Sequence, residues 1–155
     1  KNNKIINGSY HPVSEVLKKK YIHDVLSNIQ YEYEKRQPSE LDHLKPLLLS
    51  ARKKMWVYQQ RFDYFSDWKI LIDLDSVYCL FDMDNIDVAF TEKNDTIMCK
   101  DDKILKIFID NRMLEMILKR EAHWNNVETG FHINFDRRPN LYDPDLHVMF
   151  SFFHT

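Results

Sequence analysis

The spacing of apolar residues changes sharply near residue 62, and this change constrains the fold more than any other feature of the sequence. Up to that point the apolar residues recur at alternating steps of three and four, at Leu41, Leu44, Leu48, Ala51, Met55, Tyr58 and Phe62. Such a seam predicts one helix of about 22 residues, roughly 33 Å long. From Trp68 onwards apolar and polar residues alternate, which is typical of half-buried strands. The two periods together predict an α+β fold.

The second half of the chain predicts a sheet closed by helices. Short apolar runs separated by Asp- and Asn-containing turns predict five strands, at 68–74, 77–83, 86–90, 96–99 and 104–109. Asp110 is a predicted helix cap, and the helix after it carries an apolar stripe. A last strand holds Phe131, Ile133 and Phe135. We therefore expect a mostly antiparallel sheet of five to six strands packed on helices.

The first part of the chain predicts helices as well. Apolar residues recur at helical spacing from Val13 to Arg36, and Gln37-Pro38 ends that pattern because proline disfavours a helical residue before it. Ser39 is the predicted N-cap of the second helix. We expect a long antiparallel helical hairpin, and a coiled-coil dimer through the seam is the rival interpretation. The predicted organisation is a tail or linker (1–12), the helical hairpin (13–62) and the α+β domain (63–155).

Composition excludes several classes of function. The formal net charge is -2, from 22 basic and 24 acidic residues, so no basic face for nucleic acid is predicted. The sequence has no secretory signal segment and no apolar run near the roughly 20 residues that span a bilayer. Cys79 and Cys99 lie in strand-like segments, where buried free thiols are expected. These features predict a cytoplasmic protein without a membrane span.

No complete active site is visible in the sequence. None of the seven histidines forms an HxH, HxxxH or HExxH pair, so we predict no metal. Only Gly8 and Gly130 are glycines, which excludes phosphate-binding loops and any cofactor that needs one. No serine lies in a GxSxG turn. We therefore assign no catalytic residue and no cofactor. Gly130, kept inside an ordered motif, predicts a position where a side chain would be obstructed.

Polar residues gather in the stretch from Leu114 to Pro139. Five of them are candidates for a ligand-facing or partner-facing surface: His123, Trp124, Glu128, Arg137 and Arg138. In the functional interpretation one arginine pairs with a carboxylate or phosphate. In the structural interpretation, which we favour, Trp124 fills the core and one arginine pairs with a nearby aspartate. A weaker hypothesis makes His123 and Glu128 an acid/base pair of a small enzyme.

The same stretch resembles sterol-carrier-protein-2-like domains in its order of capped helix with Leu114-x-x-Ile-Leu, Gly130 and final strand. It is more specifically similar to the C-terminal region of metallo-β-lactamase-fold hydrolases of the CMP-N-acetylneuraminate hydroxylase type. The residues that carry this likeness are Trp124, Gly130-Phe131, Phe135 and Arg138-Pro139. The resemblance covers residues 66–154 as a pattern and is specific over 114–153.

This resemblance implies a sterol-carrier-like sheet closed by a helix and a strand. In such enzymes the chemistry belongs to a separate metallo-β-lactamase-fold domain with an HxHxDH cluster, which this sequence lacks. We therefore expect a non-catalytic accessory domain or subunit that shapes substrate access or oligomerisation of such a partner. The first residue, Lys1, agrees with an excised C-terminal piece or a separately encoded subunit, and a homo-oligomer is a further expectation.

The alternative function is a freestanding carrier of apolar ligands such as lipids. Apolar residues are plentiful enough to line a pocket between sheet and helices. The four side chains predicted to line it are Phe81, Leu114, Leu118 and Phe131.

Overall fold

The computed structural model describes residues 14–93 and 102–155, and the chain divides into two compact units, 1–35 and 36–155. The first unit contains α1 (Glu15–Asp24) and two 3-10 turns, Leu26–Asn28 and Glu32–Lys35. The helix predicted as far as Arg36 thus ends at Asp24. No residue of α1 is buried, and a helix this short gains little stability without packing. The packing of α1 as half of a hairpin stays a prediction.

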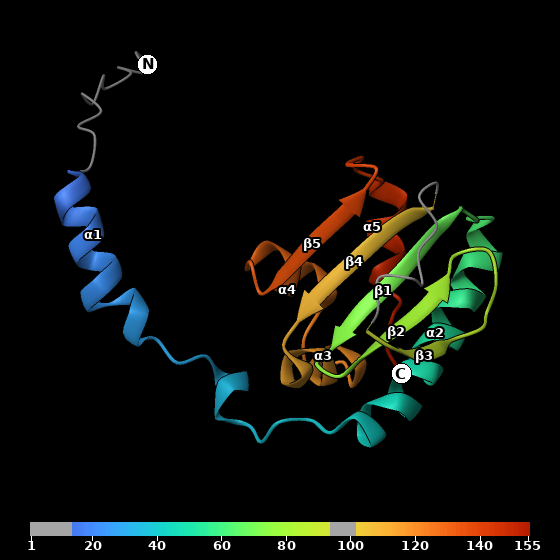
Figure 1. The fold of residues 1–155 in the computed structure, drawn as a ribbon, viewed down its shortest axis with the longest axis horizontal. Coiled ribbons are helices and arrows are strands. Elements are labelled where there is room, and N and C mark those ends of the chain that lie inside the picture. The colour runs from blue at the N-terminus through green and yellow to red at the C-terminus, as the bar shows by residue number, and fades with distance from the viewer. Residues whose placement is uncertain (1–13, 94–101) are drawn as a thin grey trace, which may run out of the picture. The chain divides into compact units, whose positions relative to one another are not determined.

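The second unit holds the sheet and its helices (Figure 1). Its elements follow in the order α2 (Leu41–Phe62), β1 (Trp68–Leu74), β2 (Val77–Asp82), β3 (Ala89–Glu92), β4 (Lys103–Ile109), α3 (Asn111–Leu118), α4 (Trp124–Thr129), β5 (Ile133–Arg138) and α5 (Pro144–Phe150). The long helix has the predicted bounds, but its N-cap is Glu40. The unit boundary groups α2 with the sheet, so the division lies at residues 35/36 instead of the predicted 62/63.

The α+β class is confirmed, but the sheet is mixed. Its five strands are ordered β3-β2-β1-β4-β5, and β1 runs parallel to β4 whereas the other neighbours are antiparallel. β4 lies on the side of β1 away from β2 and runs in the same direction as β1. The alternation of apolar and polar residues predicts that a segment is a strand, but it does not predict which other strand pairs with it. The predicted strand 96–99 lies outside the described residues.

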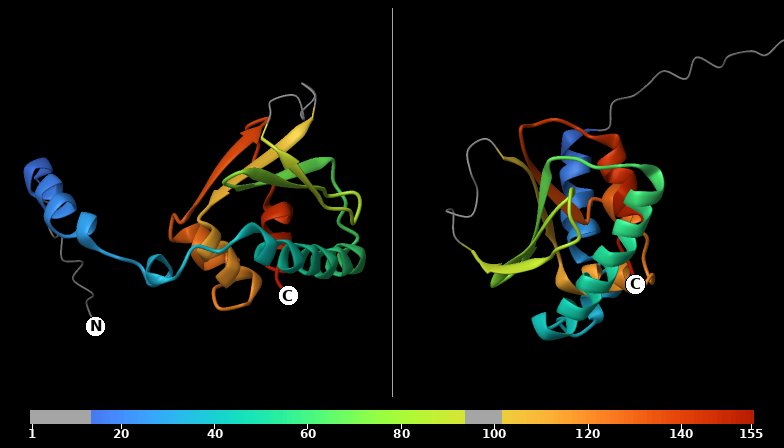
Figure 2. Two further views of the ribbon diagram at one scale, coloured as in Figure 1. Left: turned by 60° about the horizontal axis from the view of Figure 1, so that its bottom comes forward. Right: turned by 90° about the vertical axis from the view of Figure 1, so that its right-hand side faces the viewer.

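The core lies between one face of the sheet and the helices α2 to α5 (Figures 1 and 2). Fully buried side chains come from both layers, including Ile70, Ile72, Leu105, Ile107, Leu44, Leu48, Met55 and Phe150. Removal of this apolar surface from water is the main stabilising contribution. No helix within the described part of the second unit covers the other face, where Leu71, Tyr78 and Ile104 form a small buried cluster. The two hollows described below lie on the face of the sheet that α2 to α5 cover, which we call the helical side.

A buried arginine fixes α2 to the turn between β2 and β3. Arg52 donates to the backbone carbonyl of Asp82 at 3.0 Å, to that of Asn85, and to the side chain of Gln59. Its guanidinium carbon also lies 5.1 Å from the centre of the Phe81 ring. Burial lowers the pKa of Arg52 to about 10, against the opposing effect of nearby Asp82. The group therefore stays charged at neutral pH, and this charge is balanced by carbonyl dipoles and acidic neighbours.

Replacement of Arg52 by alanine should lower the free energy of unfolding by about 3 kcal/mol, because one buried and two part-buried acceptors lose their donor. Urea denaturation followed by circular dichroism measures this loss. Arg52→Lys keeps the charge without the planar fork and should recover only part of it. The exposed neighbour gives the control Lys53→Ala, which should change stability by less than about 0.5 kcal/mol. Equal effects at the two positions would contradict the anchoring role.

Candidate functional site

Two hollows flank α5 on the helical side of the second unit. The α4–α5 cleft has a volume of about 410 Å³ and is lined by Asn125, Glu128, Thr129, Tyr142, Pro144, His147, Val148 and Ser151. The α2–α5 groove has a volume of about 400 Å³ and is lined by Phe62, Asp63, Tyr64, Asp145, Val148, Met149 and Phe152. Both volumes are in the range of small-molecule sites. Val148 belongs to both linings, so the helix α5 forms a wall of each hollow.

The α4–α5 cleft contains a carboxylate–imidazole contact. Oε1 of Glu128, on α4, lies 2.8 Å from Nδ1 of His147, on α5. His147 is only 6% exposed, and its Nδ1 is buried without a hydrogen bond of acceptable geometry. The distance would fit a hydrogen bond, but the geometry does not. The contact places one acidic and one basic group of adjacent helices side by side in the cleft.

Tyr142 stands at the mouth of the same cleft. Its side chain is 62% exposed, and its ring centre lies 4.8 Å from that of His147. The guanidinium carbon of Arg137 lies 5.6 Å from the Tyr142 ring and equally far from the ring of Phe135. An exposed tyrosine is thus held between a cation and an imidazole. Tyrosine and arginine are the residue types that dominate binding energy in protein interfaces.

Aromatic side chains form the apolar part of the α2–α5 groove. The rings of Tyr58 and Phe152 stack with their centres 4.0 Å apart, and the Phe62 ring lies 5.8 Å from that of Phe152. Phe62 is 53% exposed and Val148 is 54% exposed, so apolar surface faces solvent on both sides of the groove. Contiguous exposed apolar surface of this kind marks ligand or partner sites more often than isolated apolar residues do.

The carboxylate of Asp143 connects the segments beside the groove through hydrogen bonds. Oδ2 of Asp143 accepts hydrogen bonds from the Tyr64 hydroxyl at 3.2 Å and from the Trp68 indole N–H at 3.1 Å. Its Oδ1 accepts from the backbone N–H of Leu146 at 3.0 Å and so caps α5. Burial raises the pKa of Tyr64, and the charges of Asp143 and Asp145 add to this effect. The hydroxyl therefore remains protonated and available as a donor.

The predicted surface residues do not share one surface. Trp124 is 2% exposed and stacks on Phe150 with ring centres 4.4 Å apart, as the structural interpretation predicted. Arg137 and Arg138 are consecutive in β5, so their side chains leave opposite faces of the sheet. Arg137 faces the helices and Arg138 the other side. The structure brings Glu128 and the neighbourhood of Arg137 together at the α4–α5 cleft.

The acid/base pair proposed for a small enzyme is not formed by the predicted residues. His123 is exposed at the N-cap of α4, whereas Glu128 contacts His147. The structure confirms that a side chain at residue 130 would be obstructed, because a Cβ added to Gly130 would lie 2.9 Å from the backbone oxygen of Asn126. A side chain there would push against the end of α4.

The four predicted pocket residues do not line a common cavity. Phe81, Leu114 and Leu118 are packed in the core, whereas Phe131 is 90% exposed with a positive φ of 60° just before β5. The apolar hollow lies at the end of α2 instead. Sequence analysis missed its wall α5, although Asp143-Pro144 carried the signal of a capped helix start with proline in the first turn.

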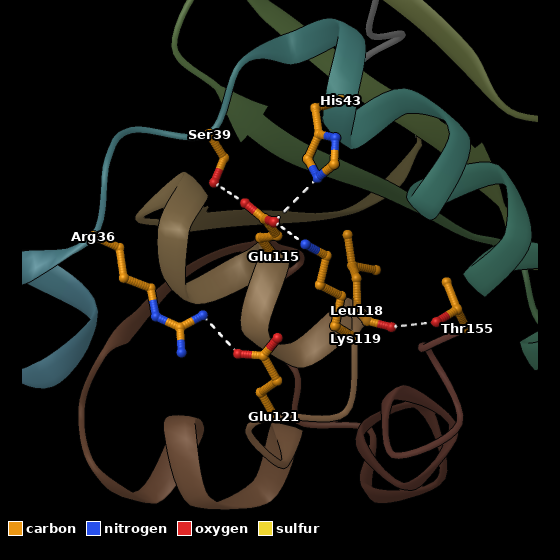
Figure 3. Close-up of polar contacts among 8 residues, drawn as sticks. All are labelled: Arg36, Ser39, His43, Glu115, Leu118, Lys119, Glu121 and Thr155. Atoms are coloured by element: carbon orange, nitrogen blue, oxygen red, sulfur yellow. Dashed lines mark hydrogen bonds and ion pairs between the residues drawn. The ribbon is translucent and has the colours of Figure 1, made fainter.

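A second polar cluster surrounds Glu115 on α3 (Figure 3). Its carboxylate accepts from the Ser39 hydroxyl and the Lys119 ammonium, and it lies 3.1 Å from Nε2 of His43. These donors, chiefly Lys119, lower the pKa of Glu115 to about 2. The serine donates to a carboxylate and not to a histidine, so its oxygen is not activated as a nucleophile. The cluster fastens the start of α2 to α3.

Two further contacts in Figure 3 support the same fastening. Arg36 Nη1 lies 2.6 Å from a carboxylate oxygen of Glu121, and the Thr155 hydroxyl donates to the backbone carbonyl of Leu118 at 2.9 Å. They tie both ends of the second unit to the region of α3. We assign this cluster a structural role.

The stability contributed by Glu115 should depend on pH. Its folded-state pKa is depressed, so the contribution is complete above about pH 4.5, the unfolded value, and is lost as the pH falls towards 2. Glu115→Gln should remove about 2 kcal/mol at pH 7, and the difference from the parent should shrink between pH 4.5 and 2. Urea denaturation across that range measures it. Asp42→Asn, at an exposed carboxylate on α2, is the control. If the difference in the free energy of unfolding between Glu115→Gln and the parent stayed constant between pH 4.5 and 2, this account would be contradicted.

No three His, Cys, Asp or Glu side chains converge to hold a metal ion within residues 14–93 and 102–155. Among the helices of that described part, none combines the length and the apolar character needed to cross a bilayer. The chain matches no family model, no curated protein and no solved structure.

Proposed function

We propose that this chain is a non-catalytic accessory domain or subunit that docks on a metallo-β-lactamase-fold catalytic domain, in the cytoplasm, and shapes its substrate access or its oligomeric state. The observation that carries the docking role is Tyr142, exposed at the mouth of the α4–α5 cleft. The class of partner comes from the sequence resemblance around Trp124, Gly130 and Arg138. The helices α3 and α4 pack on the sheet and are followed by its edge strand β5, in agreement with the helix and strand which that resemblance implies.

The geometry around Tyr142 favours binding to a protein surface. Arg137 and His147 already restrict the ring, so docking costs less side-chain entropy than it would at a freely rotating tyrosine. Leu141 beside it is also exposed and adds apolar area. The cleft behind the ring offers Glu128 and the Asn125 amide as polar partners. An aromatic anchor with adjacent polar groups is the usual composition of the centre of an interface.

Tyr142→Ala should weaken binding to the catalytic domain about tenfold or more, because truncation of an anchor residue typically costs about 2 kcal/mol. The two parts, expressed as separate polypeptides, are mixed and their dissociation constant is measured by titration calorimetry. Phe131→Ala is the matched control, since this aromatic side chain is 90% exposed and lines neither hollow. Equal affinities of the Tyr142→Ala variant and the parent would contradict docking at this cleft.

The class of partner has its own test. The coding region of this chain, or an adjoining reading frame, should encode an HxHxDH-bearing domain. A region without such a segment would contradict the proposed partner, whatever the result at Tyr142.

A second candidate function is the carriage of apolar ligands. The specific observation that favours it is the α2–α5 groove, with its exposed Phe62 and Val148 and with Phe152, which stacks on Tyr58 behind it. The first three of these residues line the groove in place of the predicted set, and hydrogen bonds to Asp143 position Tyr64 and α5 beside it. Binding of a neutral ten-carbon alcohol tests this role and is included in the experiment below.

A further inference from the structure

We propose that the α2–α5 groove binds single-chain amphiphiles with a cationic headgroup, such as an alkylammonium. This inference rests on the carrier role proposed above and adds the chemical class of the ligand. The aliphatic chain would lie along the aromatic side chains, and the headgroup would sit between Asp63 and Asp145. The two features that carry the inference are the apolar lining and the sign of the charge at its rim.

The apolar lining is built from both helices and from the segment that follows α5. Phe62 closes α2, Val148 and Met149 come from α5, and Phe152 stacks on Tyr58 at 4.0 Å. The volume of about 400 Å³ suits a single alkyl chain, because it lies at the lower end of the range for small-molecule pockets. Each methylene that leaves water on binding adds favourable free energy. The alkyl chain of the ligand thus contributes affinity but no preference between headgroups.

The rim supplies that preference. Asp63 follows α2 as its left-handed C-cap, with φ of 53°, and Asp145 lies in the first turn of α5. Both are exposed, and within the described residues neither forms an ion pair. The lining of the groove includes these two carboxylates and, among the described residues, no lysine or arginine. The unbalanced charge at the mouth of the groove is therefore negative.

A cation is the headgroup that this rim favours. Two exposed carboxylates attract an ammonium group and repel a carboxylate at similar distance, although water and salt weaken both effects. The rings of Phe62 and Tyr64 line the same groove and can offer their electron-rich faces to an ammonium group. A fatty-acid anion would instead leave three like charges close together, which selects against it. The groove should therefore distinguish ligands by the charge of the headgroup and not by the alkyl chain.

Three probes with ten-carbon chains test the preference: decyltrimethylammonium, decan-1-ol and decanoate. Binding to the full chain is measured by titration calorimetry below the micellar concentrations, at low and at physiological salt. We expect the cation to bind about tenfold more tightly than the alcohol, and the anion more weakly than either. Higher salt should reduce the difference in affinity between the three probes, because it screens exposed charges.

The double variant Asp63→Asn/Asp145→Asn should bind the three probes with nearly equal affinity. Asparagine tolerates the left-handed backbone of residue 63, so the variant should keep the fold. The control Asp87→Asn/Asp136→Asn makes the same change in net charge at exposed residues outside the groove and should keep the preference. Circular dichroism and thermal unfolding check that both variants are folded.

Each outcome decides between the ligand class and the carrier role. If decan-1-ol binds but the cation binds no more tightly, the ligand class is overturned and the carrier role stands. A preference that survives in Asp63→Asn/Asp145→Asn, or that is lost equally in the control variant, also overturns it. If none of the three probes binds to the folded chain, both the ligand class and the carrier role are wrong.

Discussion

The carboxylate of Asp143 holds together the three segments on which both hollows depend. It accepts from Tyr64, which follows α2, from Trp68, which begins β1, and from the first turn of α5. A helix of seven residues cannot form stably alone, so α5 depends on this cap and on the burial of Leu146, Met149 and Phe150. Its inward face completes the core, and its outward residues line the α4–α5 cleft on one side and the α2–α5 groove on the other.

The polar clusters of the second unit divide into those that hold the fold and those that face a hollow. Arg52 and Glu115 belong to the first kind, because each satisfies its charge with partners from another element. Glu128 and Arg137 belong to the second kind, since they surround Tyr142 and the cleft behind it. The proposed function is therefore binding on the two sides of α5. Docking of a protein at the cleft and binding of a small amphiphile in the groove share only Val148 among the lining residues and are compatible.

Local patterns in the sequence predicted the elements better than their arrangement. The seam of α2, the alternation in β1 and the Asp110 cap were visible because each depends on neighbours within a few residues. The parallel pairing of β1 with β4 was not, because it depends on the path between distant strands. Likewise, the pattern did not predict where α1 would end, nor that Phe131 would be exposed. The hollows were missed because their common wall, α5, is too short to show a hydrophobic period.

The most direct test of the central claim is hydrogen exchange of the backbone amides of this chain, alone and with the catalytic domain that we propose as its partner. Our account predicts slower exchange on complex formation in α4 and in residues 141–150, around Tyr142 and the cleft. It predicts little change in β2 and β3, at the far edge of the sheet. Slower exchange confined to β2 and β3, with α4 and α5 unchanged, would contradict the claim that this chain docks through the helical side beside α5.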